Sequence, residues 1–262
     1  MLNDETLLRY SRHLLLDEWA ESHQQRLANS HVLVVGMGGL GCAVAPYLVS
    51  SGVGTITLVD FDTVSLDNLQ RQVLYRQSNI GLHKVSAAAA NLAMINPEVT
   101  IKPQAVRWSE AECEHYLLTE DVNLVIDCSD NFDTRYALNR ICLKHKLPLV
   151  SGAAVEWEGR LMVFDFRQAD SPCYHCVFPE GDDIQERRCA TTGIFAPLVG
   201  IVGAMQAGEA LKVLAGVGKA STHTLFSLNV ASNQWRTSRF QADSECQVCA
   251  TQLLKTKKLV PL

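Results

Sequence analysis

The sequence predicts an α/β fold in which a mostly parallel sheet, with helices on both faces, continues into antiparallel strands. Short apolar strands and helical segments alternate from residue 31 to residue 151, which favours parallel strands joined by helices. Beyond residue 151 the chain changes to segments of alternating polar and apolar residues, as in strands with one exposed face. We expect a single domain over residues 1–262, made of a helical arm (1–28), a first half (29–150) and a second half (151–262).

The elements of the first half are delimited by apolar runs and by residues that stop helices. Residues 4–28 predict one or two polar amphipathic helices. His31–Val35 is a β-branched run that ends at a glycine, and an alanine-rich helix predicted at 83–95 stops at Asn96-Pro97. The other predicted elements are strands at 55–60, 99–105, 122–127 and 149–151 and helices at 41–51 and 132–145.

In the second half, residues 160–166, 224–230 and 234–240 alternate like exposed antiparallel strands, and the last two form a predicted hairpin. Residues 197–215 are mostly apolar. We expect a buried core helix there, because the segment is too short and too rich in glycine for a membrane span. Residues 179–190 are charged and lack periodicity, which predicts a mobile surface loop.

The composition is typical of a soluble protein with a large core, since 47% of the residues are hydrophobic and 19% are charged. A net charge of −5 does not favour nucleic acid or an anionic membrane as a partner. The first residues include acids and no long apolar run, so they predict neither a signal peptide nor a transit peptide. The sequence therefore predicts a cytoplasmic protein.

A glycine-rich turn lies between the first predicted strand and the next helix. The segment VLVVGMGGLGCAV places Gly36, Gly38 and Gly41 in G-x-G-x-x-G spacing, with Gly39 between them. Glycines let backbone N–H groups approach phosphate oxygens, and the following helix adds the positive end of its dipole. Asp60 ends the next strand, where an acid binds ribose hydroxyls. The turn predicts a nucleotide site in a Rossmann-like fold; the alternative is a purely structural turn.

The residues after Asp60 favour ATP over NAD. A triphosphate needs several cations and a metal ion, whereas the pyrophosphate of NAD needs few. Asp130, just past the fourth strand in DCSDN, is a candidate Mg²⁺ ligand. The candidate nucleotide ligands are Asp62, Asn68, Arg71, Gln72 and Lys84, with Arg12 from the N-terminal arm. Taken singly, the candidates have ordinary interpretations as solvated arginines, a lysine at a helix start or an N-cap aspartate.

Two C-x-x-C pairs predict a metal site in the second half. Cys173 and Cys176 form one pair and Cys246 and Cys249 the other. A single pair could be redox-active, but two pairs in a cytoplasmic protein favour a closed tetrahedral zinc site with a structural role. His175 lies inside one pair and is expected to be a spectator. The sequence thus predicts one Zn²⁺ per chain and a zinc-bound C-terminal segment.

The other cysteines fall into two groups. Cys189 stands alone in ERRCATTG, where two arginines favour the thiolate. It is either an ordinary exposed cysteine or a reactive one. Cysteines in helix-like or strand-like segments are expected to fill the core; these are Cys42, Cys113, Cys128 and Cys142.

Six stretches occur in a characteristic order: RYSRHLLL, GMGGLG, GVGTITLVDFDTVSLDNLQRQ, DCSDN, CYHC and CQVC. In these stretches the chain resembles the bacterial ThiF/MoeB/HesA family, relatives of the ubiquitin-activating enzymes, over nearly its whole length. The resemblance implies a homodimer in which each subunit uses MgATP to adenylate the Gly-Gly tail of a ubiquitin-like sulfur-carrier protein. Residues 29–150 would be the nucleotide-binding half and 151–262 the zinc and carrier-binding half.

The resemblance also implies roles for single residues. Asp60 would be the ribose ligand, and the phosphate ligands would be Asn68, Arg71 and Lys84. The chain departs from the family pattern at His83, where proline is common, which leaves the placement of Lys84 open.

Three further roles follow from the resemblance. Arg12 would be the arginine lent to the neighbouring subunit's ATP, and Asp130 would bind the metal. Cys189 matches the cysteine through which ThiF-like members link to the activated carrier through sulfur. MoeB-like members carry a cysteine near this position without an agreed need for it.

Adenylation suits these residue types. A terminal carboxylate has a pKa of ~3.5 and is already ionised at neutral pH, so catalysis needs positioning and charge neutralisation rather than a general base.

Two alternative functions stay open. An NAD-dependent oxidoreductase would explain the glycine turn but neither the cations nor the cysteine pairs. A non-catalytic dimer that only binds the carrier would not explain why all the residues expected for catalysis are present.

The identity of the carrier is less defined. ERRC and SNQWRTSRF resemble members that serve a ThiS-like carrier in thiamine synthesis, while FDTVSL and VSGAA resemble members that serve a MoaD-like carrier in molybdopterin synthesis. Taken together, these stretches slightly favour a ThiS-like carrier. Because the chain stops soon after the second C-x-x-C pair, we expect the sulfur donor to be a separate protein.

Overall fold

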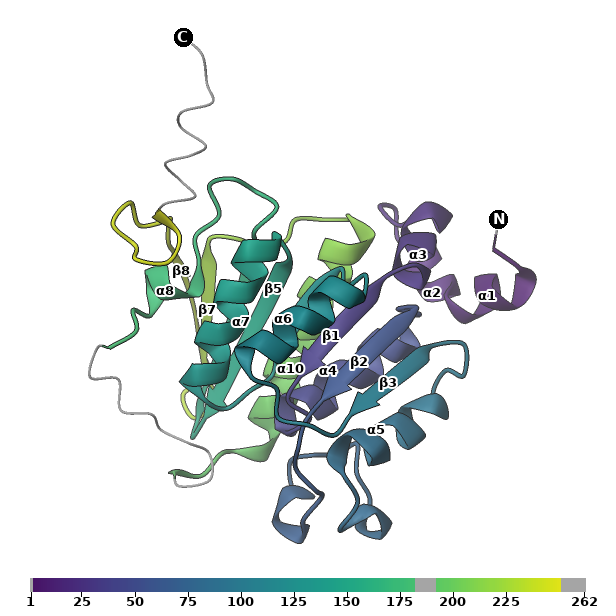
Figure 1. Ribbon diagram of the computed structural model, residues 1–262. Helices are drawn as coiled ribbons and strands as arrows, with labels where there is room; N and C mark the ends of the chain where they lie inside the picture. Colours follow the sequence, from purple (N-terminus) through teal and green to yellow (C-terminus); the bar gives the residue numbers. More distant parts are fainter. Residues whose placement is uncertain (1, 182–191, 251–262) are drawn as a thin grey trace.

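The computed structural model describes residues 2–181 and 192–250. Within these residues, eight strands form one sheet in the order β3-β2-β1-β4-β5-β6-β7-β8 (Figure 1). Strand pairs from β3 to β5 are parallel, and those from β5 to β8 are antiparallel. The predicted change from a parallel to an antiparallel sheet is confirmed. The strands are β1 (His31–Val35), β2 (Thr55–Val59), β3 (Thr100–Gln104), β4 (Leu124–Asp127), β5 (Pro148–Val155), β6 (Glu158–Asp165), β7 (Thr224–Asn229) and β8 (Gln234–Arg239).

Helices cover both faces of the sheet, as predicted (Figure 1). Along β1, Val32 and Val34 belong to the core on one face and Leu33 to the core on the other, which is the alternation of a strand buried on both sides. The helices of the first layer are α4 (Gly39–Ser50), α5 (Lys84–Ala93) and α10 (Ala196–Ala215), and those of the second are α6 (Glu110–Thr119) and α7 (Phe132–His145).

The N-terminal arm contains three short helices, α1 (Asp4–Arg9), α2 (Ser11–Leu14) and α3 (Glu21–Ala28), rather than one or two. Tyr10 breaks the run between α1 and α2 and anchors the arm. Its hydroxyl accepts a hydrogen bond from Asn96 Nδ2 at 2.9 Å, and a Cβ on Gly52 would lie 2.4 Å from it. Because Gly52 and Asn96 follow the ends of α4 and α5, the arm packs at the amino ends of the parallel strands.

Beyond the N-terminal arm, most predicted elements agree with the structure to within two residues at each end; one helix was not predicted and one strand is longer than predicted. Helix α6 was missed because its sequence is largely polar, with Cys113 as its buried residue. Its start was readable from the capping box formed by Ser109 and Glu112. The strand predicted at 149–151 is longer, because β5 continues to Val155, where it pairs with Glu158 of β6.

Smaller elements complete the described chain. Two 3₁₀ turns, Leu66–Asn68 and Gln77–Asn79, shape the connection from β2 to α5, and α8 (Tyr174–Val177) follows Cys173. Of the surface loop predicted at 179–190, residues 182–190 lie outside the described residues.

Helix α10 is long and apolar enough to cross a membrane by length and composition alone. Of its most apolar stretch, 61% is buried inside the protein. It packs so closely on α4 that a Cβ on Gly203 would lie 2.6 Å from Cβ of Ala43. The helix is therefore not too short to cross a membrane, contrary to our expectation, but its burial confirms a core helix.

Candidate functional site

The glycine turn connects β1 to α4 at the carboxyl end of β1. Gly36 has a φ of +96°, and a Cβ there would lie 2.6 Å from the carbonyl oxygen of Cys128. A Cβ on Gly41 would lie 2.1 Å from the carbonyl oxygen of Gly36. Gly36 is thus required by its backbone conformation and Gly41 by the close approach of two backbone segments.

Helix α4 begins without a side-chain cap. Gly38 is its N-cap residue, and the first turn carries no acidic residue. Gly39 brings this turn against α10, since a Cβ there would lie 2.9 Å from Val199 Cγ1. The N–H groups of a first helical turn have no partner within the helix, and the helix dipole adds positive potential to them. This end of α4 can therefore accept an anion such as phosphate.

Asp60 fixes the glycine turn to the end of β2. Its Oδ2 accepts a hydrogen bond from the Met37 N–H at 2.7 Å, and its Oδ1 accepts one from the Asp62 N–H at 2.8 Å. Burial raises the pKa of the Asp60 carboxyl above its ordinary value, although Lys84 and these two N–H groups oppose the rise. The predicted ribose ligand thus lies directly beside the predicted phosphate turn.

Lys84 opens α5 and is buried, with 6% of its surface exposed. Its Nζ forms an ion pair with Asp62 Oδ2 at 2.9 Å, and its backbone N–H donates to the Asp62 carbonyl at 2.9 Å. His83 pairs with Thr63 in an isolated bridge, which fixes the start of α5 without a proline. The question raised by His83 is thereby answered: the ammonium group of Lys84 lies next to the Asp60–Asp62 turn.

The connection after β2 brings three more predicted residues to this region. Arg71 donates from Nη1 to the Asp67 carbonyl at 3.0 Å. Asn68 is 8% exposed and Gln72 is 2% exposed. A Cβ on Gly38 would lie 3.8 Å from Gln72 Nε2, and Gln72 Oε1 is buried with no hydrogen-bond partner among the described residues. A buried acceptor without a partner is costly, so a ligand that donates a hydrogen bond would be favoured there.

The loop after β4 carries Asp130. Its base is rigid, because buried Asp127 accepts hydrogen bonds from Ser129 Oγ at 2.6 Å and Ser151 Oγ at 2.7 Å. The Cys128 carbonyl touches Gly36, so the loop borders the glycine turn. Asp130 itself is exposed and is free of the tight packing around Asp127. Its carboxylate is available to a metal–phosphate complex.

The four cysteines of the C-x-x-C pairs converge on one point, as predicted. All four sulfurs lie within 4.8 Å of one another. The Sγ–Sγ distances are 3.8 Å for Cys173–Cys176, 3.7 Å for Cys173–Cys246 and 3.4 Å for Cys176–Cys249. These distances are too long for disulfides, whose S–S bond is ~2.05 Å. They fit the edges of a tetrahedron of sulfurs around zinc, which are about 3.8 Å long for a Zn–S bond of about 2.3 Å.

A second layer of donors surrounds the sulfurs. The backbone N–H groups of Cys173 and Asp243 each donate to Cys176 Sγ at 3.5 Å. His175 is 8% exposed, and its Nδ1 lies 3.7 Å from Cys246 Sγ. Hydrogen bonds of this kind orient metal ligands and stabilise negative charge on sulfur. His175 therefore contacts the cluster, and the expectation that it is a mere spectator was incomplete.

Comparison with known proteins identifies the family. A family model described as the ThiF family matches residues 10–248.

The chain belongs to the ThiF family.

Relatives of this ThiF family member match it over nearly its full length. The molybdopterin-synthase adenylyltransferase of Escherichia coli strain K12 is 41% identical over 251 residues, 95% of this chain and 98% of that protein. The sulfur carrier protein ThiS adenylyltransferase of the same strain is 38% identical over 248 residues, 95% of this chain and 97% of that protein. The structure of E. coli MccB with ATP has the same fold, with a TM-score of 0.81 at 23% identity over 95% of this chain and 75% of that chain.

One residue implied by the resemblance to this family, Arg12, is not brought to the glycine turn. Arg12 is exposed on α2, in the arm that packs at the amino ends of the strands, at the opposite end of the sheet from Gly36 and Asp60 (Figure 1). It cannot reach the glycine turn of its own chain. Cys189 lies outside the described residues.

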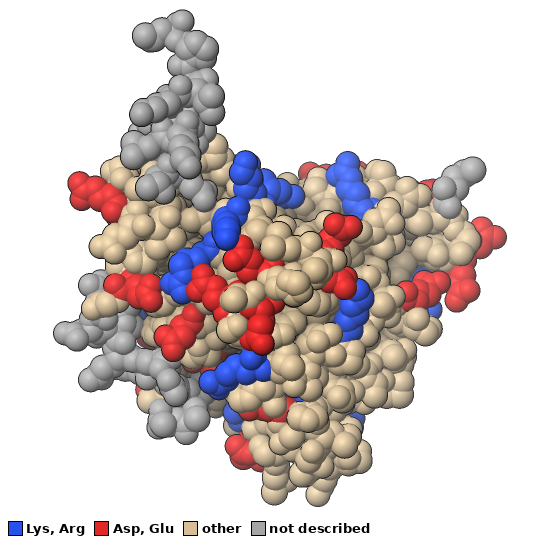
Figure 2. Space-filling model, in the orientation of Figure 1, with Lys and Arg blue, Asp and Glu red and all other residues tan. Residues whose placement is uncertain are grey.

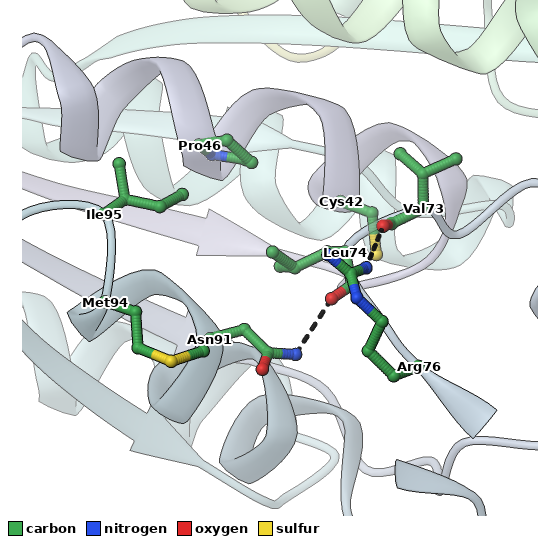
Figure 3. A pocket seen from close by; sticks show the side chains of 8 residues that line it. All are labelled: Cys42, Pro46, Val73, Leu74, Arg76, Asn91, Met94 and Ile95. Carbon is green, nitrogen blue, oxygen red and sulfur yellow. Dashed lines mark hydrogen bonds between the residues drawn. The ribbon is translucent and has the colours of Figure 1, made fainter. Parts of the chain in front are cut away.

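A cavity of about 450 Å³ lies on the outer side of α4 and α5 in this ThiF family member (Figure 3). Asn91 Nδ2 donates to the Leu74 carbonyl at 2.9 Å across it. Cys42 closes its inner wall, and burial raises the pKa of this thiol to about 12, so the thiol stays neutral at physiological pH. None of the predicted nucleotide ligands lines this cavity. Cys42 is a core residue, as predicted.

The face formed by α6 and α7 has mixed charge (Figure 2). Arg140 pairs with Glu110 at 2.7 Å and with Glu180 at 3.3 Å, and Lys102 pairs with Glu120 at 2.6 Å. Basic side chains on this face are thus neutralised locally. A polyanion would meet no uniform positive surface there.

Three residues of the site in this ThiF family member were missed from the sequence. Tyr75 donates to the Met37 carbonyl at 2.8 Å, Arg135 Nη2 donates to the Ser129 carbonyl at 2.7 Å, and Gln206 Nε2 donates to the Asp127 carbonyl at 2.8 Å. Arg135 had a readable signal, since it shares the buried face of α7 with Leu138. A charge on an apolar helix face needs a specific partner.

The close approach within the turn gives a first prediction. Gly41→Ala will weaken ATP binding by about one to two orders of magnitude, because relief of a backbone clash costs about 1–3 kcal/mol. Isothermal titration with ATP measures this change. Gly208→Ala is the matched control: it lies in α10 with no atom within 4 Å of the added Cβ, and its ATP affinity should equal that of the wild type. Equal affinities in all three proteins would show that the turn does not hold the nucleotide.

Proposed function

We propose that this chain is an ATP-dependent adenylyltransferase that activates the C-terminal glycine of a ubiquitin-like sulfur-carrier protein as an acyl-adenylate and releases pyrophosphate. The observation that carries the proposal is the identity of 41% and 38%, over 95% of the chain, to two sulfur-carrier adenylyltransferases. The carrier is MoaD-like or ThiS-like, and the product serves molybdopterin or thiamine biosynthesis in the cytoplasm.

The geometry supports ATP as the nucleotide. The open N-terminus of α4 accepts phosphate, Asp60 at its side accepts the ribose hydroxyls, and Gln72 Oε1 offers a buried acceptor. Asn68, Arg71 and Lys84 supply donors and positive charge for the phosphates, and Lys84 exchanges its contact with Asp62 for one with phosphate. An NAD-dependent oxidoreductase would need no such concentration of donors.

The reaction needs neutralisation of charge more than proton transfer. The carrier's terminal carboxylate is ionised at neutral pH and attacks the α-phosphorus, while the bond from this phosphorus to the pyrophosphate oxygen breaks. Arg71 and Lys84 stabilise the charge that develops on the departing pyrophosphate. Asp130 would hold Mg²⁺, which neutralises phosphate charge when it is bound.

The position of Arg12 supports a homodimer. This residue lies at the end of the sheet away from its own glycine turn. In the dimer that we propose, Arg12 of each protomer completes the phosphate site of its partner. The non-catalytic alternative, a dimer that only binds the carrier, keeps this geometry but predicts no turnover.

Zinc is the metal that we propose for the cysteine cluster. Four sulfurs at tetrahedral spacing leave no open coordination position, so the metal has a structural role. It would tie the segment after β8 to α8, and so to the end of β6. Metal analysis of the purified protein should find about one Zn²⁺ per chain, held by the four thiolates.

ATP–pyrophosphate exchange tests the proposed function. We expect exchange only in the presence of one of two carriers, ThiS-like or MoaD-like, and none with a carrier that lacks the last glycine. Absence of exchange with both carriers, together with tight NAD binding, would support the oxidoreductase. Tight carrier binding without exchange would support the non-catalytic dimer.

Cys189 is proposed to link to the activated carrier through sulfur. Cys189→Ala should leave ATP–pyrophosphate exchange unchanged and abolish formation of the carrier thiocarboxylate, as measured by mass spectrometry of the carrier. Cys113→Ala, a change at a buried cysteine of α6, is the control and should retain both activities. Full thiocarboxylate formation by Cys189→Ala would refute the role.

A further inference from the structure

Arg135 is a buried cation beside the loop that ends in Asp130. It lies in the first turns of α7 and is 7% exposed. Its Nη2 donates to the carbonyl of Ser129, the residue immediately before Asp130, at 2.7 Å. Its guanidinium also interacts electrostatically with the carboxylates of Asp127 and Asp130 and with the hydroxyl of Tyr174. This buried charge therefore lies beside the stretch from Asp127 to Asp130 and holds its backbone at Ser129.

The same stretch is held from the other face of the sheet. Gln206 of α10 is fully buried and donates from Nε2 to the Asp127 carbonyl at 2.8 Å. Its side chain crosses β5 at Gly152, where a Cβ would lie 2.3 Å from Gln206 Cδ. The residues that lead to Asp130 thus accept a hydrogen bond from α7 on one face of the sheet and from α10 on the other. Asp130 projects from a fixed base.

One of these supports comes from the cysteine cluster. Tyr174 lies between Cys173 and His175, and its ring and hydroxyl are buried, with 2% exposed. Its backbone N–H donates to Asn139 Oδ1 at 2.8 Å. Asn139 and Arg135 are four residues apart on α7 and lie on the same face. Tyr174 contacts this face through its backbone N–H, and its hydroxyl interacts electrostatically with Arg135. A short path leads from the cluster through Tyr174 and Arg135 to Ser129.

We propose that Arg135 and Tyr174 are positioning residues that orient the Asp130 loop and thereby link the cysteine cluster to metal binding at the nucleotide site. This inference rests on the proposed function, because it takes Asp130 as the Mg²⁺ ligand. Neither side chain touches ATP in this arrangement. Both act through the backbone at Ser129.

The test compares the effect of Mg²⁺ in two conservative variants. Tyr174→Phe removes a hydroxyl and keeps the ring packed on Tyr136 and Phe164, and Arg135→Lys keeps the buried charge. Arg135→Lys loses the guanidinium geometry that donates to the Ser129 carbonyl, and Tyr174→Phe loses the hydroxyl that interacts with this guanidinium, so the Mg²⁺ concentration at half-maximal exchange should rise about 2- to 10-fold in each. ATP affinity without Mg²⁺ should stay within about twofold of the wild type, and zinc content should be unchanged. Arg140→Lys, on the exposed side of the same helix, should match the wild type.

Several outcomes decide the inference. Unchanged Mg²⁺ dependence in folded Tyr174→Phe would overturn it, and so would an equal loss of ATP affinity with and without Mg²⁺, because that result indicates general damage. If Arg135→Lys fails to fold, Tyr174→Phe alone is decisive. Calorimetric ATP titrations with and without Mg²⁺ need no carrier and no turnover. They test the positioning role even if exchange is absent and the proposed function fails.

Discussion

Asp130→Asn should lower the rate of ATP–pyrophosphate exchange by about 10²- to 10³-fold, the usual cost of removing one electrostatic contact to a transition state. The amide retains the size of the side chain but loses the charge that we propose to hold Mg²⁺ against the phosphates. Because Asp130 is exposed and lies outside the hydrogen-bond network of Asp127, the melting temperature should change little. The measurement is steady-state exchange at saturating carrier with a series of Mg²⁺ concentrations.

Asp133→Asn is the matched control for this variant. Asp133 is also exposed and lies three residues further along, in the first turn of α7. Its exchange rate should remain within about twofold of the wild type, since it is not a proposed ligand. Equal rates for Asp130→Asn and the wild type would remove Asp130 from the site.

Cys249→Ser should have the largest effect on stability. We expect zinc content to fall from about one per chain to near zero and the melting temperature to fall by about 20 °C or more, since structural zinc binds with about 10–16 kcal/mol and each kcal/mol is about 2–4 °C in a chain of this size. Metal analysis and calorimetry check the two results together.

The control is Cys142→Ala, at a fully buried cysteine of α7 outside the cluster. It should lose about 1 kcal/mol, or about 2–4 °C, and retain its zinc. If Cys249→Ser kept a full complement of zinc, the cluster would not be a four-cysteine site. If it lost zinc without loss of stability, the structural role would be wrong.

The sequence was sufficient for the parts of the site that have local signals. The glycine spacing, the acid at the end of β2 and the C-x-x-C pairs are each carried by a few adjacent residues, and the structure brings Gly36 to Asp60 and Cys173 to Cys246. Strands β1, β2 and β4 were predicted because they are buried on both faces and their residues are mostly apolar. Local patterns of this kind depend on backbone geometry alone.

The parts that were missed depend on contacts between distant residues. Gln206 lies 79 positions from Asp127, and no local pattern relates the two. Helix α6 was missed because most of its surface faces water, so its apolar periodicity is weak. The far placement of Arg12 could be seen only from the packing of Tyr10 on Gly52. Local patterns therefore indicated candidate ligands, which stay predictions, and gave no signal for most of the residues that support them.

The spacing of the cysteines has a consequence for how the protein is made. Cys173 and Cys246 lie 73 positions apart, as do Cys176 and Cys249, whereas the nucleotide ligands on β1 to β4 all precede them. As a chain emerges from the ribosome, its N-terminal part folds first. The parallel half can thus assemble on the nascent chain before the last two thiolates exist. The zinc that we propose could be bound by all four thiolates only after that, so metal supply would act on a late step of maturation.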